Sequence, residues 1–445
     1  MKKRAFLALS IAGALAVAVA GILTTVALVP DVALPFKTGG TAEVESGKPA
    51  LRDGALFLEQ VAEGLQFPTS MAFLDANNIL VLQKNDGQVR LVSGGELVEQ
   101  PVLQVAVENK IERGLLGIAV WNGSSATSNE VFLYLTENVT GDGGNAVAMN
   151  RIYKYNYDWD QRALVNGTLL LDLAGGPGPY HNGGKIIIGP DGYLYAVIGD
   201  TNDSRGISDN DFSDEPPDFR SVIVRVDRET GEAPGDNPFY GTEGLEKAYA
   251  YGIRNSFGMD FDPVTNSLWM TENGPTSYDE INVVPPGFNS GWDKFTGPIA
   301  RSNATMDDLV MVKGARYGDP AFSWYIPVGV TDIEFFDSEK LGEKYRDNIF
   351  VGDVNNGNLY FFEADQNRTG LYFGYEHPGL ADLIADPVPD KDTGRLDGEL
   401  PSITFGKGFA AITDIETGPD GYLYVLTHID GKIYRITAAG AAGQQ

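Results

Sequence analysis

Two near-identical copies of one short segment constrain the fold of this chain more than any other feature of its sequence. Gly189-Pro-Asp-Gly-Tyr-Leu-Tyr-Ala-Val-Ile198 returns as Gly418-Pro-Asp-Gly-Tyr-Leu-Tyr-Val-Leu-Thr427. Each copy places an Asp-Gly turn before an alternation of apolar residues, which is a strong signal for a β-hairpin. Weaker copies begin at Asp75, Asp262 and Tyr345. The chain is therefore expected to repeat one β-unit several times.

Repeated β-units without long helical periodicity predict a propeller. We expect an all-β fold over residues 55–437, a six-bladed β-propeller of four-stranded antiparallel blades. A strand near residues 55–61 is expected to close the ring by pairing with the last blade, and residues 438–445 are expected to form a disordered tail. The predicted units span about 63–93, 113–156, 182–228, 249–285, 320–363 and 408–437.

The composition excludes several classes of function. The chain has no cysteine, so a thiolate metal site and a cysteine nucleophile are excluded, and its three histidines argue against a multi-histidine zinc or copper site. With 61 acidic and 33 basic residues, the net charge is −28. Nucleic-acid binding needs clustered Lys and Arg, so nucleic acid is not an expected partner.

The N-terminus has the features of an export signal. Lys2-Lys-Arg4 precedes a run without charge from Ala5 to Val29, which is long enough to span a bilayer. We interpret residues 1–30 as a hydrophobic helix that is either a signal peptide or an uncleaved membrane anchor. Residues 31–54, rich in Gly, Pro and Thr, are expected to be a flexible tether. The basic end should stay in the cytoplasm, which places the rest outside it, membrane-anchored or secreted.

The stretch after residue 248 carries the strongest chemical signal. An Arg254-Asn255 pair precedes a strand-turn-strand unit, and a loop rich in oxygen ligands follows it, with Glu272-Asn-Gly-Pro275 and Asp279-Glu-Ile-Asn282. Carbonyl and carboxylate oxygens suit a hard cation such as calcium. The guanidinium group suits an anionic ligand nearby.

Several segments, taken in order, resemble one known family, the glucose/sorbosone dehydrogenases. The family includes soluble glucose dehydrogenases and aldose sugar dehydrogenases that use pyrroloquinoline quinone (PQQ), and its members are six-bladed propellers. The resemblance implies calcium- and PQQ-dependent oxidation of an aldose C1 hydroxyl to a lactone, with electrons passed to an external acceptor. The matching segments are Phe67-Pro-Thr-Ser-Met-Ala-Phe73, Glu112-Arg-Gly-Leu-Leu-Gly-Ile-Ala119, His181-Asn-Gly-Gly-Lys-Ile186, Ala250-Tyr-Gly-Ile-Arg-Asn255, Glu272-Asn-Gly-Pro275, Asp279-Glu-Ile-Asn282 and Pro327-Val-Gly-Val-Thr331.

The resemblance implies roles for four residues near the quinone. His181 matches the catalytic base that removes the proton of the sugar hydroxyl, a role suited to imidazole near neutral pH. Arg254 and Asn255 match the pair that contacts the quinone, where a guanidinium stabilises developing negative charge. Glu112 sits where the family carries Gln or Glu near sugar and cofactor.

The same resemblance implies two calcium sites. Gly274 and Pro275 match backbone-carbonyl ligands of the calcium that polarises the quinone. Glu280 matches a carboxylate ligand of a second, structural calcium. Ser290 lies where that second site takes another ligand, often Tyr in the family, so its side chain is a weaker candidate than its carbonyl.

The chain departs from the family at the positions that hold the quinone carboxylates. Quinone-dependent relatives carry one Lys and two Arg there, whereas this chain has Asn355, Ala411 and Thr413. Charge-assisted hydrogen bonds are lost with these cations. Lys407 and Lys185 are the candidates to replace them.

Two other functions therefore stay open beside the dehydrogenase. One is a non-catalytic surface binding propeller that keeps the fold and the calcium loop but has lost the quinone site. The other is a calcium-dependent lactonase or esterase, which would need carboxylates around a central calcium. Fold alone does not separate the three.

Overall fold

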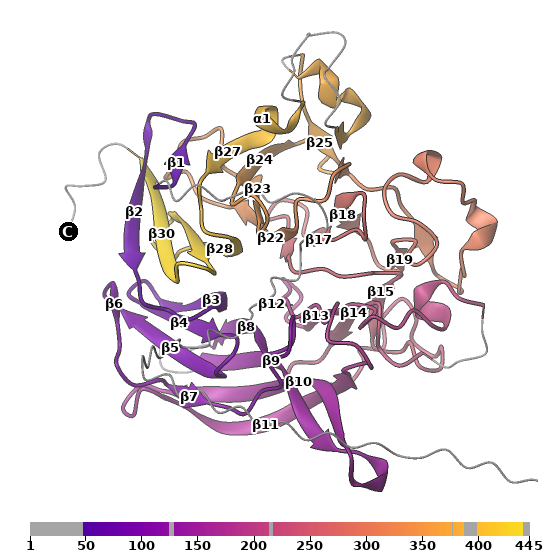
Figure 1. Cartoon of the computed structure of the whole chain (residues 1–445), viewed down its shortest axis with the longest axis horizontal. Helices are drawn as coiled ribbons and strands as arrows, with labels where there is room; N and C mark the ends of the chain where they lie inside the picture. The colour runs from indigo at the N-terminus through magenta and orange to yellow at the C-terminus, as the bar shows by residue number, and fades with distance from the viewer. Residues whose placement is uncertain (1–47, 124–128, 213–216, 376, 387–397, 439–445) are drawn as a thin grey trace, which may run out of the picture. The chain divides into compact units, whose positions relative to one another are not determined.

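The computed structural model describes residues 48–123, 129–212, 217–375, 377–386 and 398–438. The predicted apolar helix in residues 1–30, residues 31–47 of the predicted tether and residues 439–445 lie outside these ranges. Within the described ranges, no helix has the length and apolar character needed to cross a membrane. The ranges are mainly strands, so the predicted all-β class is confirmed (Figure 1).

The strands group into six sheets. The first sheet holds β3 (Pro68–Asp75), β4 (Asn78–Gln83), β5 (Gln88–Ser93), β6 (Glu96–Leu97) and β7 (Leu103–Gln104). The second holds β8 (Leu115–Asn122), β9 (Asn129–Thr140), β10 (Ala146–Asp158) and β11 (Ala163–Ala174). The third holds β12 (Ile186–Ile188), β13 (Leu194–Ile198), β14 (Val222–Val226), β15 (Ala248–Tyr251), β19 (Phe288–Asn289) and β20 (Arg316–Tyr317).

The other three sheets complete the set. The fourth holds β16 (Met259–Phe261), β17 (Leu268–Glu272), β18 (Asp279–Val284), β21 (Phe322–Trp324) and β26 (Ile384–Ala385). The fifth holds β22 (Val330–Phe336), β23 (Asn348–Asp353), β24 (Leu359–Ala364), β27 (Thr404–Lys407), β1 (Ala50–Leu51) and β25 (Leu371–Tyr372). The sixth holds β28 (Ile412–Thr417), β29 (Leu423–Thr427), β30 (Lys432–Ala438) and β2 (Leu56–Ala62).

Helices in the described residues are short. One is α-helical and the others are 3-10 helices: α1 (Leu400–Ile403), η1 (Asp142–Gly144), η2 (Ile207–Asp209), η3 (Ile299–Arg301), η4 (Met306–Asp308) and η5 (Pro378–Asp382).

The sheets are arranged as a propeller around inner strands. In chain order β3, β8, β12, β16, β22 and β28 each contact the next, and β28 contacts β3 again (Figure 1). Apolar side chains fill the space between neighbouring sheets. Each of six buried clusters joins two adjacent sheets, including one of Met71, Ile79, Leu426 and Ile433 between the last sheet and the first. The predicted propeller class is thus confirmed.

Two details of the blades differ from the prediction. The sheets hold four to six strands rather than four throughout, because short strands from long loops add to outer edges, in part with parallel pairing, as β19 and β26 do. Such additions cover otherwise unpaired edge groups. The predicted boundaries between units are also displaced by one strand. Strand β15 belongs to the sheet of β12, β13 and β14, and β21 belongs to the sheet of β16, β17 and β18, whereas the sequence assigned each of them to the following unit.

The ring closes through its two ends, as expected. Strand β2 pairs antiparallel with β30, from Leu56 opposite Ala438 to Ala62 opposite Ile433. An ion pair of 2.7 Å between Glu59 and Arg435 joins the same two strands. The first long strand of the propeller therefore completes its last sheet.

A buried ion cluster crosses the inner ring. Lys185, just before β12, places its ammonium 2.8 Å from Asp332 on β22 and 2.9 Å from Asp414 on β28, with Glu416 at 3.5 Å. These three carboxylates are close enough together to share a metal ion. Because the Lys185 ammonium already contacts all three, it fills the cation position of the cluster.

Inner-strand carboxylates also link three pairs of neighbouring sheets, those of β16 with β22, β22 with β28 and β28 with β3. Each accepts a hydrogen bond from a backbone N–H of the following inner strand, which satisfies a donor that a sheet edge leaves unpaired. The donors and acceptors are Phe335 to Asp260 (2.7 Å), Ile415 to Asp332 (3.0 Å), Thr417 to Glu334 (2.7 Å) and Met71 to Asp414 (2.6 Å).

We predict that Lys185→Met destabilises the propeller by about 3–5 kcal/mol, because it leaves Asp332 and Asp414 buried without a counter-ion. Denaturant unfolding of the purified protein measures this change. Lys407→Met, at an exposed position of β27, is the control and should change the free energy of unfolding by less than about 0.5 kcal/mol. A Lys185→Met protein as stable as the control would contradict the role of the cluster.

Candidate active site

His181 lies on a tight loop between β11 and β12. Its own φ is 57°, and Gly183 and Gly184 follow with φ of 61° and 121°. A Cβ at Gly183 would lie 2.4 Å from the Val197 carbonyl oxygen, so only glycine fits there. The loop is also held from outside, because the His181 backbone N–H donates to the Glu112 carboxylate at 2.6 Å.

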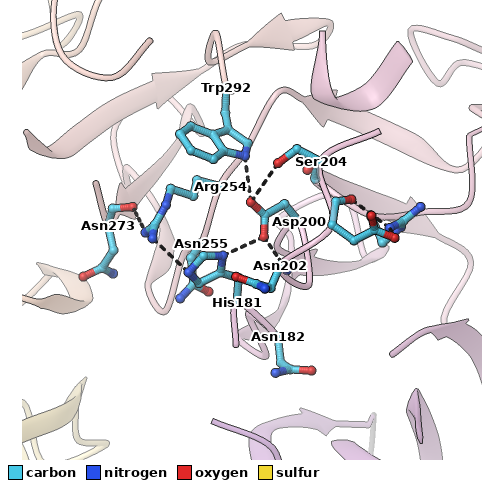
Figure 2. Close-up of polar contacts among 12 residues, drawn as sticks. His181, Asn182, Asp200, Asn202, Ser204, Arg254, Asn255, Asn273 and Trp292 are labelled. Carbon is cyan, nitrogen blue, oxygen red and sulfur yellow. Dashed lines mark hydrogen bonds and ion pairs between the residues drawn. The ribbon is translucent and has the colours of Figure 1, made fainter. Parts of the chain in front are cut away.

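The two ring nitrogens of His181 have different partners. Nδ1 lies 2.6 Å from Oδ1 of Asp200, and Nε2 lies 2.9 Å from Nη2 of Arg254 (Figure 2). A guanidinium nitrogen can only donate, so Nε2 accepts from Arg254 and Nδ1 carries the proton that is donated to Asp200. The neutral ring therefore presents the lone pair of Nε2, the atom a general base uses.

Asp200 was not among the predicted site residues. Besides His181, its carboxylate accepts from Trp292 Nε1 at 2.8 Å, Ser204 Oγ at 3.2 Å and the Asn202 N–H at 2.7 Å. Burial alone would raise the pKa of Asp200, but the hydrogen bond and charge of His181 outweigh it, so the pKa is lowered. The available signal was its position directly after β13, the strand that pairs with the one following His181.

Arg254 connects His181 to the predicted calcium loop. Its backbone N–H donates to Glu272 at 2.7 Å, and Nη1 donates to the carbonyls of Asn273 at 2.8 Å and Gly274 at 3.3 Å. The guanidinium lies 5.4 Å from the Trp292 ring centroid, a cation–π distance. One half-buried cation thus contacts both the base and a carbonyl predicted to bind calcium.

Glu112 and Asn255 lie together behind His181. Asn255 Nδ2 donates to Glu112 at 3.2 Å, and its Oδ1 accepts from the Gly183 N–H at 3.3 Å. Burial raises the pKa of Glu112, against the influence of His181. The structure therefore brings Glu112, Asn255, His181 and Arg254 into one group. Glu112 and Asn255 thus hold the loop that carries His181, through its backbone N–H groups.

The predicted second calcium site lies around Glu272, which the sequence placed in the oxygen-rich loop but not among the ligands of this site. Glu272 on β17 is directly opposite Glu280 on β18, and Ser290 donates to Glu272 at 2.6 Å. Asn282 Nδ2 donates to Glu280 at 2.9 Å, whereas its buried Oδ1 has no hydrogen-bond partner. Two buried carboxylates with an unpartnered amide oxygen beside them fit a calcium ion.

Burial sets the protonation of this carboxylate pair. It raises the pKa of both Glu272 and Glu280, and the charge of Glu272 raises that of Glu280 further. A divalent cation would reverse this effect by favouring the ionised forms.

At the first predicted calcium site, Gly274 faces Arg254, while Pro275 is exposed and no described contact links it to His181.

The positions expected to hold quinone carboxylates are neutral. Asn355 donates its backbone N–H to Val328 at 3.3 Å, and Thr413 Oγ1 donates to the Pro68 carbonyl at 3.1 Å. The third, Ala411, has a φ of 62°.

Neither lysine expected to compensate is placed to do so. Lys185 is bound by the buried carboxylates of the inner ring, and Lys407 is exposed on β27. Lys84 is a cation that the sequence analysis did not single out. Burial lowers its pKa to about 8, against the effect of nearby Glu112.

Comparison with known proteins gives a consistent result. A family model described as glucose/sorbosone dehydrogenase matches residues 65–435. Aldose sugar dehydrogenase YliI of Escherichia coli is 27% identical over 386 residues, which cover 85% of this chain and 92% of that protein.

Two solved structures share the fold. The soluble aldose sugar dehydrogenase of Escherichia coli in its apo-form has a TM-score of 0.66 at 24% identity, covering 86% of this chain and 99% of that one. A PQQ-bound aldose sugar dehydrogenase from Streptomyces coelicolor has a TM-score of 0.61 at 21% identity, covering 87% and 99%.

We predict that, with divalent cations chelated, the free energy of unfolding falls as pH rises from the ordinary Glu value of 4.5 through neutrality. The folded pKa values of Glu272 and Glu280 are raised, so the folded state holds protons that the unfolded state has released. Glu280→Gln should reduce this fall by about 1–3 kcal/mol, because an amide has no proton to release over this range of pH. Denaturant unfolding at several pH values measures the effect.

Glu363→Gln, an exposed position, is the control and should leave the pH dependence unchanged. Added calcium should restore stability at alkaline pH in the wild type and much less in Glu280→Gln. A pH dependence identical in wild type and Glu280→Gln would contradict the assignment of this pair as a cation site.

Proposed function

This chain belongs to the glucose/sorbosone dehydrogenase family, and we propose that it is a PQQ- and calcium-dependent dehydrogenase that oxidises aldose sugars from the C1 hydroxyl to the lactone. We further infer that each of its six sheets is one propeller blade. The observation that carries the proposal is the line from Asp200 through His181 to Arg254.

This line gives each residue a role in proton and charge transfer. With Nδ1 committed to Asp200, the lone pair of His181 is on Nε2, where it accepts from Arg254. That atom would take the proton of the sugar hydroxyl when the hydroxyl replaces Arg254 as its donor. The ionised Asp200 then stabilises the imidazolium that forms. Arg254, beside the base, stabilises negative charge that develops on the substrate or on a bound quinone.

The cofactor would be held by residues around Arg254. PQQ, when bound, supplies the two-electron acceptor for the hydride that leaves C1. Arg254 and Asn255 would contact it, and the carbonyls of Gly274 and Pro275 would hold the calcium. These residues fit the redox end of the cofactor, whereas Asn355, Ala411 and Thr413 offer its carboxylates no positive charge.

We also propose that the protein is exported. A basic end followed by an uncharged run over residues 5–29 supports a membrane anchor or a secretion signal, which places the propeller outside the cytoplasm. Electrons would then leave the reduced cofactor to an external acceptor.

A second candidate is a surface binding propeller without quinone chemistry. The neutral Asn355, Ala411 and Thr413 favour it, since a tricarboxylate cofactor would bind more weakly there. A lactonase with a central calcium is less well supported, because the carboxylates that meet inside the ring bind the ammonium of Lys185.

We predict that the protein, supplied with PQQ and calcium, reduces an artificial dye in the presence of aldose sugars. His181→Ala should lower kcat/KM by about 10²–10⁴-fold, the usual contribution of a general base. His377→Ala, a histidine outside the Asp200 and Arg254 group, is the control and should keep full activity. A wild type that binds calcium but shows no sugar-dependent reduction would support the binding propeller instead.

A further inference from the structure

One side chain touches both partners of His181. The Trp292 indole N–H donates to Oδ2 of Asp200 at 2.8 Å, while its ring lies against the Arg254 guanidinium, 5.4 Å from the ring centroid. Figure 2 shows the indole lying over Asp200 and Arg254. Trp292 is therefore the point where the acidic and basic neighbours of His181 are held together.

Trp292 is itself held by a buried amide network. Asn210 Nδ2 donates to the Trp292 carbonyl at 2.7 Å, and the Trp292 N–H donates to the Gly252 carbonyl at 3.1 Å. The side chains of Asn210 and Asn289 also exchange hydrogen bonds of 2.9 and 2.7 Å, and both residues are fully buried. The backbone of Trp292 is thus fixed independently of its indole.

The two carboxylate oxygens of Asp200 have different hydrogen-bond donors. Oδ2 accepts from Trp292 and, at a longer 3.2 Å, from Ser204, while Oδ1 faces His181. Without the indole donor, Oδ2 would keep only the weaker hydroxyl donor, and the carboxylate could rotate about Oδ1, which the Asn202 N–H still holds at 2.7 Å. Rotation would change the direction of the Asp200–His181 hydrogen bond, which, together with the Arg254 donor on Nε2, determines where the imidazole proton resides.

We propose that Trp292 is a positioning residue that orients Asp200, keeps the proton of His181 on Nδ1 and so keeps Nε2 unprotonated, as a base requires. The importance of this role for catalysis rests on the proposed function. The role itself is a statement about the histidine tautomer, which is measured without cofactor or sugar. Trp292 acts through Asp200 and needs no contact with substrate.

The test compares Trp292→Phe with Trp159→Phe. Trp159 also donates its indole N–H to a side-chain oxygen, that of Asn129 at 2.9 Å, so the control removes the same kind of bond elsewhere. Nitrogen NMR of the three histidines of the full chain reports the tautomer of His181. Trp292→Phe should lower the ratio of the Nδ1–H to the Nε2–H tautomer by about tenfold, and Trp159→Phe should leave it unchanged. An unchanged ratio in Trp292→Phe would overturn the proposal.

A measurement on the wild type covers the case in which Trp292→Phe does not fold. The indole N–H resonance of Trp292 should shift with pH at the midpoint of His181, since Asp200 links the two, while that of Trp159 should not. A Trp292 resonance that does not shift when His181 is protonated would overturn the proposal.

Activity then separates the proposal from the proposed function. If the enzyme is active, Trp292→Phe should lower kcat by about tenfold with little change in KM, and the acid limb of its pH profile should move. A tautomer change in a protein that never oxidises sugar would refute the dehydrogenase and support the positioning role. Full kcat with an unmoved pH profile would overturn the catalytic part.

Discussion

The ammonium of Lys185 is the contact on which both the ring and the site depend. It crosses the inner strands to reach carboxylates on β22 and β28, which are not its neighbours in the ring. Buried charges of this kind are stable only when paired, so the inner strands must keep their places for the cluster to form. Lys185 also ends the His181-Asn-Gly-Gly-Lys segment, so the chain that carries the base is anchored four residues later at the inner ring.

The site is built where loops enter and leave inner strands, a rigid frame that presents functional side chains. Backbone hydrogen bonds link these loops in order: Thr201 donates to His181, Asp200 to Arg254, and Asn273 to Asn255. Each site side chain is thus carried by backbone that is bonded to the next loop. The geometry of His181 is therefore a property of several blades at once.

Local patterns predicted much of this architecture, whereas long-range pairings were beyond them. Asp-Gly turns and apolar alternation are local, so the hairpins were foreseen. The closing pair of β2 and β30 was the exception, because a ring of repeated units requires its first strand to meet its last blade. The motif around His181 and Arg254 also led to residues that do meet. Asp200, Glu272 and Trp292 were missed because their roles depend on partners far along the chain. Lys185 was misjudged for the same reason, since its charge belongs to the inner carboxylates.

The central question is whether a site with Arg254 but with neutral Asn355, Ala411 and Thr413 holds the quinone. Calorimetric titration of PQQ into the purified full-length protein, with calcium present, answers it most directly. The account predicts saturable binding that needs calcium and is strongly weakened in Arg254→Met. Absence of binding at high PQQ concentration, in a protein that still binds calcium, would contradict a quinone-dependent dehydrogenase and leave the family fold as a binding propeller.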